Sequence, residues 1–139
     1  MEEPGYYYEY SASLQIAGIG QFYRSIVERT GIVPTEALMA GDRFLRSSER
    51  RLESDLWLLE SRLPHTAHWD MHLGWMWQTI QPHSTYFAHI LSHAKWSNLT
   101  LGCLSNRSCP DLQVDSAALQ IFRELPLALR FVYTIGADA

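Results

Sequence analysis

Hydrophobic positions recur with a helical period along most of the chain, and turn residues separate the periodic stretches. The first stretch covers residues 11–29, and Gly31 is the predicted stop because glycine readily adopts the left-handed conformation that ends helices. The second begins at Thr35 as its N-cap and ends at Leu63, before Pro64. It places its leucines on one face, and charged residues occupy the other.

The later stretches repeat this pattern, so a helix is predicted for each of them. They are a short segment at 66–71, a Trp-rich segment from Leu73 interrupted by Pro82, a helix from Ser84 or Thr85 to Leu104, a helix capped by Asp115 or Ser116 through Leu125, and a last one from Pro126 to near Gly136. Together these segments predict an all-α fold, a compact helical bundle of six to seven helices. Residues 11–139 form one domain, and residues 1–10 form a flexible N-terminal tail.

Composition fits a single domain with a substantial core, since 47% of the 139 residues are hydrophobic and 19% are charged. The net charge of −4 argues against a nucleic-acid partner. No apolar run reaches the roughly 18 residues of a transmembrane anchor. Cys103 and Cys109 are expected to be free thiols in a reducing compartment, because no secretory signal is visible. No nucleophile–base set or phosphate loop is found, so the chain is not predicted to be an enzyme, and no cofactor is expected.

All six histidines fall between residues 65 and 93, which raises the question of a metal site. His65, His68 and His72 share one helical face, and His89 and His93 have the i, i+4 spacing of a ligand pair. However, Asp70 is the only carboxylate between residues 61 and 110. Surface and boundary histidines are therefore favoured over metal ligands, and the metal site remains the weaker alternative.

The pair Gly41-Asp42 is unusual near the start of a predicted long helix, because both residues are poor helix formers. Gly41 lies on the apolar stripe, where a small residue allows a neighbouring helix to approach. The run Ala40-Gly41-Asp42, followed by Arg43-Phe44, resembles the third homology motif (BH-3) of the Bcl-2 apoptosis regulators. Downstream, His72-Leu73-Gly74-Trp75 is similar to their first homology motif, Asn-Trp-Gly-Arg, although only the glycine matches.

The resemblance implies a Bcl-2-like bundle around a central hydrophobic helix, and it is typical of virus-encoded, anti-apoptotic members of that family. Such a protein would inhibit apoptosis by sequestering the BH-3 helices of pro-apoptotic host proteins in a hydrophobic groove. It would be cytoplasmic and would associate with mitochondria through its partners. The groove residues implied are Phe44, Leu45, Ser48, Leu52, Leu56, Leu59, Trp69, Leu73, Gly74, Trp75 and Trp77.

Two other functions stay open from the sequence. One is a His-rich helical domain that binds a metal through His65, His68, His72, His89 and His93. The other is an interaction module that dimerises and has no apoptotic role. A homodimer is also compatible with the groove, since an exposed apolar surface favours self-association.

Overall fold

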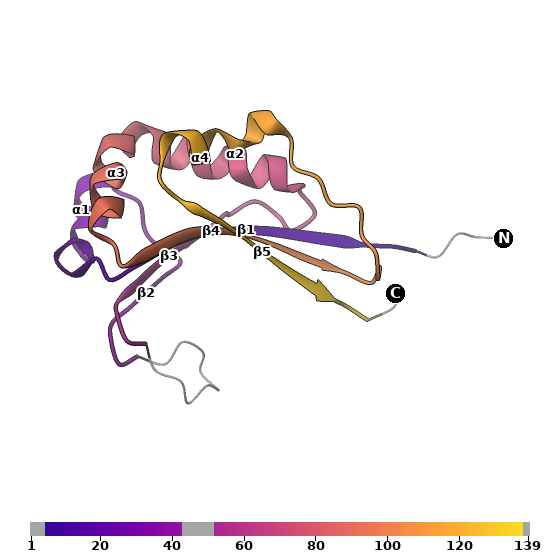
Figure 1. The fold of residues 1–139 in the computed structure, drawn as a ribbon, viewed down its shortest axis with the longest axis horizontal. Helices are drawn as coiled ribbons and strands as arrows, with labels where there is room; N and C mark the ends of the chain where they lie inside the picture. Colours follow the sequence, from indigo (N-terminus) through magenta and orange to yellow (C-terminus); the bar gives the residue numbers. More distant parts are fainter. Residues whose placement is uncertain (1–4, 43–51, 138–139) are drawn as a thin grey trace.

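The fold is mixed α/β, with a five-stranded sheet and helices packed on one of its faces (Figure 1). It comes from a computed structural model that describes residues 5–42 and 52–137. The predicted all-α, Bcl-2-like bundle is therefore wrong. In chain order the elements are β1 (Tyr8–Ala17), η1 (Gly20–Phe22), α1 (Ser25–Thr30), β2 (Glu36–Leu38), β3 (Leu56–Glu60), α2 (Trp69–Ile80), η2 (Gln81–His83), α3 (Ser84–His93), β4 (Trp96–Ser105), η3 (Ser116–Leu119), α4 (Gln120–Glu124) and β5 (Ala128–Ile135).

The strands lie in the order β2-β3-β1-β4-β5. The pairs β2–β3, β3–β1 and β1–β4 are antiparallel, whereas β4 and β5 are parallel. A parallel pair needs a crossover connection, and here η3 and α4 supply it. As a result β5, the last strand in the chain, lies at one edge of the sheet.

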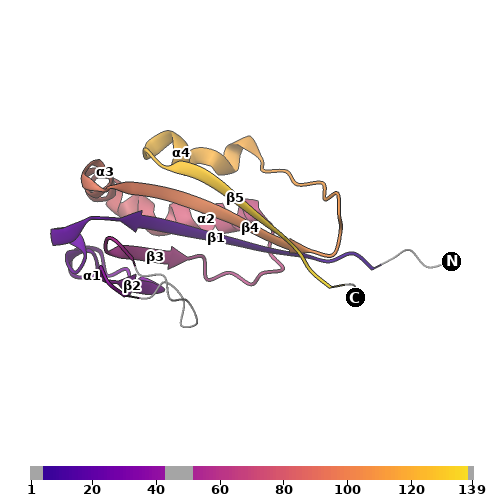
Figure 2. The same ribbon diagram turned by 60° about the horizontal axis from the view of Figure 1, so that its bottom comes forward.

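Alternation along β1 separates the two faces of the sheet. Ala12, Leu14 and Ile16 are buried on the face covered by helices, and Leu14 pairs with Leu59 on one side and Leu99 on the other. The intervening side chains point to the opposite face, which no helix of the described residues covers (Figure 2). Polar residues occupy much of that face, as expected for a one-sided antiparallel sheet: Ser11, Ser13, Gln15, Asn98, Thr100 and Thr134.

The core lies between the sheet and the helices α2, α3 and α4 (Figures 1 and 2). From the sheet, Trp57 contacts Phe87 of α3, with their ring centroids 5.9 Å apart. The side chains that α2, α3 and α4 bury in the core are Trp69, Leu73, Met76, Ile80, Phe87, Ile90, Leu91 and Ile121.

Several predicted elements are confirmed because their boundaries carry specific end signals. Gly31 ends α1 in the left-handed conformation, with φ of 73°. The Trp-rich segment is α2, and Pro82 lies in η2, between α2 and α3. Asp115 caps η3 by accepting a hydrogen bond from the Ala117 N–H.

The other predicted helices are wrong, because strands occupy their places. Residues 11–17 belong to β1, and the range 35–63 contains β2 and β3. Likewise, the helix predicted to reach Leu104 ends at His93 and is followed by β4, and the last apolar segment is β5. Strand β1 also includes the last three residues of the predicted tail, Tyr8–Tyr10.

Candidate functional site

The outer edge of β5 is the most exposed apolar part of the sheet. β5 has a strand neighbour on one side only, so the outward N–H and C=O groups along its eight residues face no strand of the described chain. Four of its apolar side chains are exposed: Leu129 to 41%, Phe131 to 57%, Val132 to 39% and Ile135 to 65%. The opposite edge differs, because β2 is only three residues long.

An apolar cleft of about 290 Å³ adjoins β5 on the helix side of the sheet. The segment that precedes η3 forms one wall, and β5 forms the other. The lining residues are Trp69, Leu112, Gln113, Val114, Leu119, Leu129, Phe131, Val132 and Tyr133. The cleft therefore continues the exposed surface of β5 toward the interior.

Trp69, at the start of α2, forms the base of this cleft. Its ring packs against Phe131, with the centroids 5.7 Å apart, and against Tyr10 at 5.4 Å. The indole Nε1–H donates a hydrogen bond to the Gly102 carbonyl at 2.8 Å, so the polar atom of this buried ring is satisfied. This bond fixes α2 against β4.

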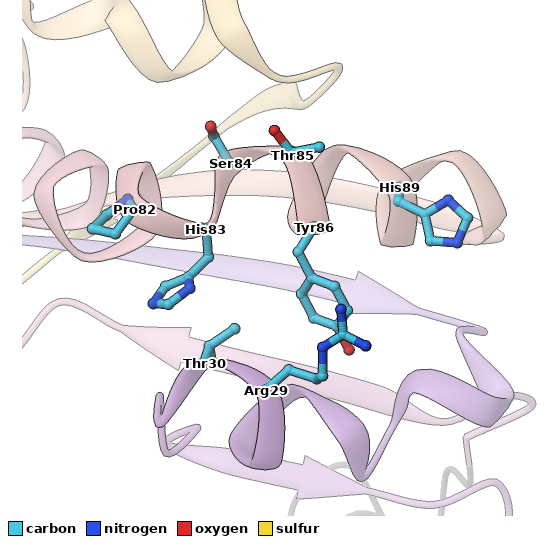
Figure 3. Close-up of a pocket in the computed structure, with 8 residues that line it drawn as sticks. All are labelled: Arg29, Thr30, Pro82, His83, Ser84, Thr85, Tyr86 and His89. Carbon is cyan, nitrogen blue, oxygen red and sulfur yellow. The ribbon is translucent and has the colours of Figure 1, made fainter.

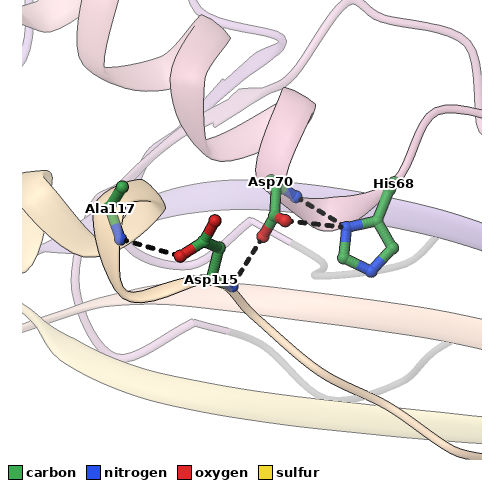
Figure 4. A network of polar contacts seen from close by, with 4 residues as sticks. All are labelled: His68, Asp70, Asp115 and Ala117. Atoms are coloured by element: carbon green, nitrogen blue, oxygen red, sulfur yellow. Dashed lines mark hydrogen bonds and ion pairs between the residues drawn. The ribbon is translucent and has the colours of Figure 1, made fainter.

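A polar network holds the other wall of the cleft in place (Figure 4). The carboxylate of Asp70, in the first turn of α2, accepts a hydrogen bond of 2.9 Å from the Asp115 N–H. Asp70 lies 3.5 Å from His68 Nδ1, which also accepts from the Asp70 N–H. The Asp70 carboxylate thus ties the segment 112–115 to α2.

The C-terminal end of β5 is anchored to neighbouring strands and loops. The Tyr133 hydroxyl donates to the carbonyl of Arg107, and the Gly136 N–H donates to Ser105 at 2.7 Å. The Tyr7 hydroxyl adds a bond of 2.8 Å to the carbonyl of Ala137. These contacts make β5 a fixed strand with an accessible outer edge.

The comparisons with known proteins identify a family for this fold. The family model described as "Domain of unknown function (DUF4279)" matches residues 8–135, from the first residue of β1 to the last of β5. The chain belongs to the DUF4279 family. No curated protein and no solved structure matches the chain.

The BH-3-like motif lies in a turn of this DUF4279 domain. The Asp42 N–H bonds to the Met39 carbonyl at 3.0 Å, which closes a β-turn with Ala40 and Gly41 in the middle. Gly41 has φ of 91°, and the Asp42 carboxylate accepts a bond of 2.7 Å from the Met39 N–H. A turn thus explains the pair of poor helix formers, whose predicted helical packing role is wrong.

The predicted groove residues are not gathered around a cleft between two helices. Leu56 and Leu59 both lie in β3 and point to opposite faces of the sheet, so they do not share one face of a helix. Leu73 is buried in the core, Gly74, Trp75 and Trp77 are half-buried along α2, and Leu52 is half-buried in a loop. Of the described groove residues, Trp69 alone lines the apolar cleft; Phe44, Leu45 and Ser48 lie outside the described residues.

The histidines of the DUF4279 domain also separate. His65 is exposed, whereas His72 is fully buried and its Nδ1 lies 2.7 Å from the Ser61 hydroxyl. The rings of His89 and His93 meet edge to face, with their centroids 4.9 Å apart and an interplanar angle of 75°. Within residues 5–42 and 52–137, no group of three or more His, Cys, Asp or Glu side chains is arranged to hold a metal.

Burial gives His72 an unusual protonation behaviour. Desolvation lowers its pKa below the ordinary 6.5, although hydrogen bonding to the backbone at Ala67 and Pro64 partly opposes this. Its Nε2 has no partner that meets hydrogen-bond geometry among the described residues. The folded protein therefore favours the neutral form of the His72 imidazole.

The two cysteines and the lengths of the helices complete the description of the chain. Cys103 is buried and Cys109 is exposed, and both are free thiols. Among the described residues, no helix is long and apolar enough to cross a membrane. The β5 edge itself was missed from the sequence, although residues 128–135 carry its signal in their β-branched and aromatic side chains.

Proposed function

We propose that this domain is a binding module, without catalytic activity, that forms a homodimer through the outer edges of two β5 strands. The observation that carries the proposal is the exposed apolar edge of β5. A long apolar edge strand readily pairs with another strand, and natural proteins usually protect it with charges, proline or a bulge. β5 contains one charge, Arg130, and no proline.

The sequence of β5 is suited to pairing with itself in the antiparallel direction. If the two-fold axis passes between the two copies of Val132, Phe131 stands opposite Tyr133 and Leu129 opposite Ile135 on the helix side. On the open side, Arg130 then stands opposite Thr134. This register places the four exposed apolar residues in cross-strand pairs and keeps the two arginines apart.

The cleft beside β5 extends the same interface. In this register the exposed Ile135 of each copy reaches the side of the sheet on which the other copy's cleft opens. Covering a cleft with walls of Trp69, Leu112 and Phe131 adds apolar burial at about 25 cal/mol for each Å² removed from water. A two-fold contact also closes on itself, so it gives a dimer and not a growing fibre.

The predicted anti-apoptotic function has no comparable support. It depends on a groove between two helices, and the sequences that implied those helices lie in a turn, a strand and a core helix. The dimerising module, left open from the sequence, is the function for which the structure offers a surface.

Cysteine cross-linking tests the register directly. In a Cys109→Ser background, Val132→Cys places two thiols opposite each other across the two-fold axis, with Cβ atoms about 4.5–5.5 Å apart, close to the roughly 3.5–4.5 Å of a disulfide. We expect this variant to form a covalent dimer under mild oxidation.

The matched control is Thr134→Cys, on the same strand and the same face. In the proposed register its thiol stands opposite Arg130, about 13 Å along the strand from its own copy, so it should stay monomeric on a denaturing gel. Equal cross-linking at both positions, or none at Val132→Cys, would contradict the proposed pairing.

A further inference from the structure

A second pocket lies at the other end of the molecule from the chain termini, between α1 and the start of α3 (Figures 1 and 3). Its volume of about 460 Å³ falls within the range of small-molecule sites. The residues that line it are Arg29, Thr30, Pro82, His83, Ser84, Thr85, Tyr86 and His89. Arg29 and Thr30 come from α1 and the others from η2 and α3.

The charge of this lining is opposite to that of the whole protein. The chain has 15 acidic residues and 11 lysines and arginines, yet the pocket has an arginine, two histidines and no carboxylate. Arg29 makes no ion pair with a carboxylate in the described part of the chain. A cation in this setting favours an anionic ligand.

Tyr86 lies against the Arg29 guanidinium. The guanidinium carbon lies 5.0 Å from the centre of the Tyr86 ring, within the range of a cation–π contact. A cation–π contact leaves N–H donors around the rim of the guanidinium available for a bidentate contact with phosphate or carboxylate oxygens.

Hydrogen bonds fix the Tyr86 ring in turn. The Ser25 hydroxyl lies 3.2 Å from the Phe22 carbonyl, to which it donates, and 2.9 Å from the Tyr86 hydroxyl. Since the Ser25 proton is used on the carbonyl, Tyr86 donates to the serine oxygen. The ring is thereby held from α1, the same helix that carries Arg29.

Opposite Arg29, the side chain of His83 points across the pocket toward Thr30, as Figure 3 shows. Its ring nitrogens make no hydrogen bond or ion pair within the described residues. An imidazole N–H at this place supplies a second donor for an anion that Arg29 holds. Ser84 and Thr85 point away from α1 in the same view, so we assign them no role.

We infer that this pocket binds a small molecule that carries a phosphate group, with Arg29 as the main contact, His83 as a second donor and Tyr86 as a positioning residue. A doubly charged phosphate matches the rim donors of an arginine better than a singly charged anion does. The volume leaves room for an organic group beyond the phosphate. The site is independent of the β5 edge.

Calorimetric titration of the wild-type chain with inorganic phosphate and with glycerol 3-phosphate tests this inference, against sodium chloride at matched ionic strength. We expect saturable binding of a phosphate compound, and Arg29→Gln should weaken it by about tenfold or more. The matched control is Arg24→Gln, which removes the same charge beside α1 from a residue outside the pocket lining, and its affinity should change less than about twofold.

Three further variants separate loss of the ligand contact from loss of the fold. Arg29→Lys keeps the charge but loses the planar donor rim, so it should bind several-fold more weakly with an unchanged circular dichroism spectrum. Tyr86→Leu should weaken binding more than Tyr86→Phe, which keeps the ring face. Tighter binding of the ester would identify a phosphomonoester as ligand, and tighter binding of the free ion would identify inorganic phosphate. If neither compound saturates, or if Arg24→Gln and Arg29→Gln weaken binding equally, the inference is wrong.

Discussion

Gly41 shows how one backbone angle decides between two interpretations of the same residues. In a helix, a glycine interior to the element lowers stability, and replacing it with alanine gains about 1 kcal/mol. In the turn formed by residues 39–42, Gly41 has φ of 91°, which alanine adopts only with strain. The two interpretations therefore predict opposite signs for one substitution.

We predict that Gly41→Ala lowers the free energy of unfolding by about 1 kcal/mol or more. Urea denaturation followed by tryptophan fluorescence measures the change. An increase in stability would contradict the turn and favour a helix at this position.

Gly74 is the internal comparison, because it lies within α2 and not in a turn. A methyl group added there would meet no atom within 4 Å, so the close approach that the resemblance implied for this glycine is not needed by the fold. We predict that Gly74→Ala raises the free energy of unfolding by about 0.5–1 kcal/mol in the same assay. A loss of stability would show that something packs against this position.

His72 predicts a specific dependence of stability on pH. Burial lowers the pKa of His72, so below about pH 6.5 this histidine binds a proton more readily in the unfolded chain than in the folded chain. The contribution of neutral His72 to the free energy of unfolding is fully present above pH 6.5. It decreases as the pH falls toward the pKa of His72 in the folded protein.

The variant His72→Asn isolates this effect, since an amide can keep the bond to Ser61 without titrating. We expect the wild type to lose stability relative to the variant when urea denaturation is repeated from about pH 8 down to pH 5. A constant difference between the two proteins over that range would show that His72 does not titrate on unfolding.

At the scale of elements, two helix end signals, Gly31 and Asp115, were read correctly, whereas Thr35 and Pro64 bound no helix and the strand signals were overlooked. Gly31 and Asp115 act locally, because a left-handed stop or a side-chain cap is decided by a few neighbouring atoms. Both could therefore be predicted. The Trp-rich α2 was also predicted, and its period is helical on the side that covers the sheet.

The strands were mistaken for helices because their apolar residues fit more than one period. A helical period was predicted for residues 11–29, whereas the side of β1 that faces the helices follows Ala12, Leu14 and Ile16 with a period of two. The partners of Leu14 in the sheet are Leu59, which is 59 − 14 = 45 residues later in the chain, and Leu99, which is 99 − 14 = 85 residues later. Such long-range pairing overrides local preference and cannot be read from a single sequence.

The candidate site was missed for the same reason. The cleft brings together α2, the segment before η3 and β5, which only the parallel crossover places side by side. Trp69 lines this cleft, whereas the sequence assigned it to a groove between two helices that the fold does not contain. The exposed edge depends on the order of strands, which no residue of β5 encodes alone.

The connection between α2 and the segment before η3 offers a test at this scale. Asp115 caps η3 and, through its N–H, bonds to Asp70. We predict that Asp115→Ala, which removes the cap but keeps the N–H, costs about 1 kcal/mol of stability. Asp70→Ala removes the acceptor instead.

If the network in Figure 4 shapes the cleft, Asp70→Ala should also increase amide hydrogen exchange across residues 112–115, more than Asp115→Ala does. Mass-spectrometric exchange on both variants measures this. Equal protection in the two variants would show that the apolar packing of the cleft holds the segment without the Asp70 bond.

At the scale of the whole molecule, the two edges of the sheet are unequal. β2 is three residues long, and β5 is eight residues long and apolar, so only one edge can support extended pairing. Joining two β5 edges would make one continuous sheet of ten strands, with the helices of both copies on the same side (Figures 1 and 2). The polar open face would lie outside the interface in both copies.

Sedimentation equilibrium of the full chain, repeated with Val132→Lys, tests this assembly most directly. The substituted side chains would place two like charges opposite each other at the two-fold axis, at a position that is already 39% exposed in one copy. Val33→Lys is the matched control, because Val33 is 56% exposed and lies in the segment before β2, the strand at the opposite edge of the sheet from β5. We predict the mass of two 16.0 kDa chains for the wild type and for Val33→Lys, and a dissociation constant raised about tenfold or more for Val132→Lys. A wild-type protein that stays at 16.0 kDa up to roughly millimolar concentration, or a Val132→Lys variant that dimerises as well as the wild type, would contradict self-association through β5.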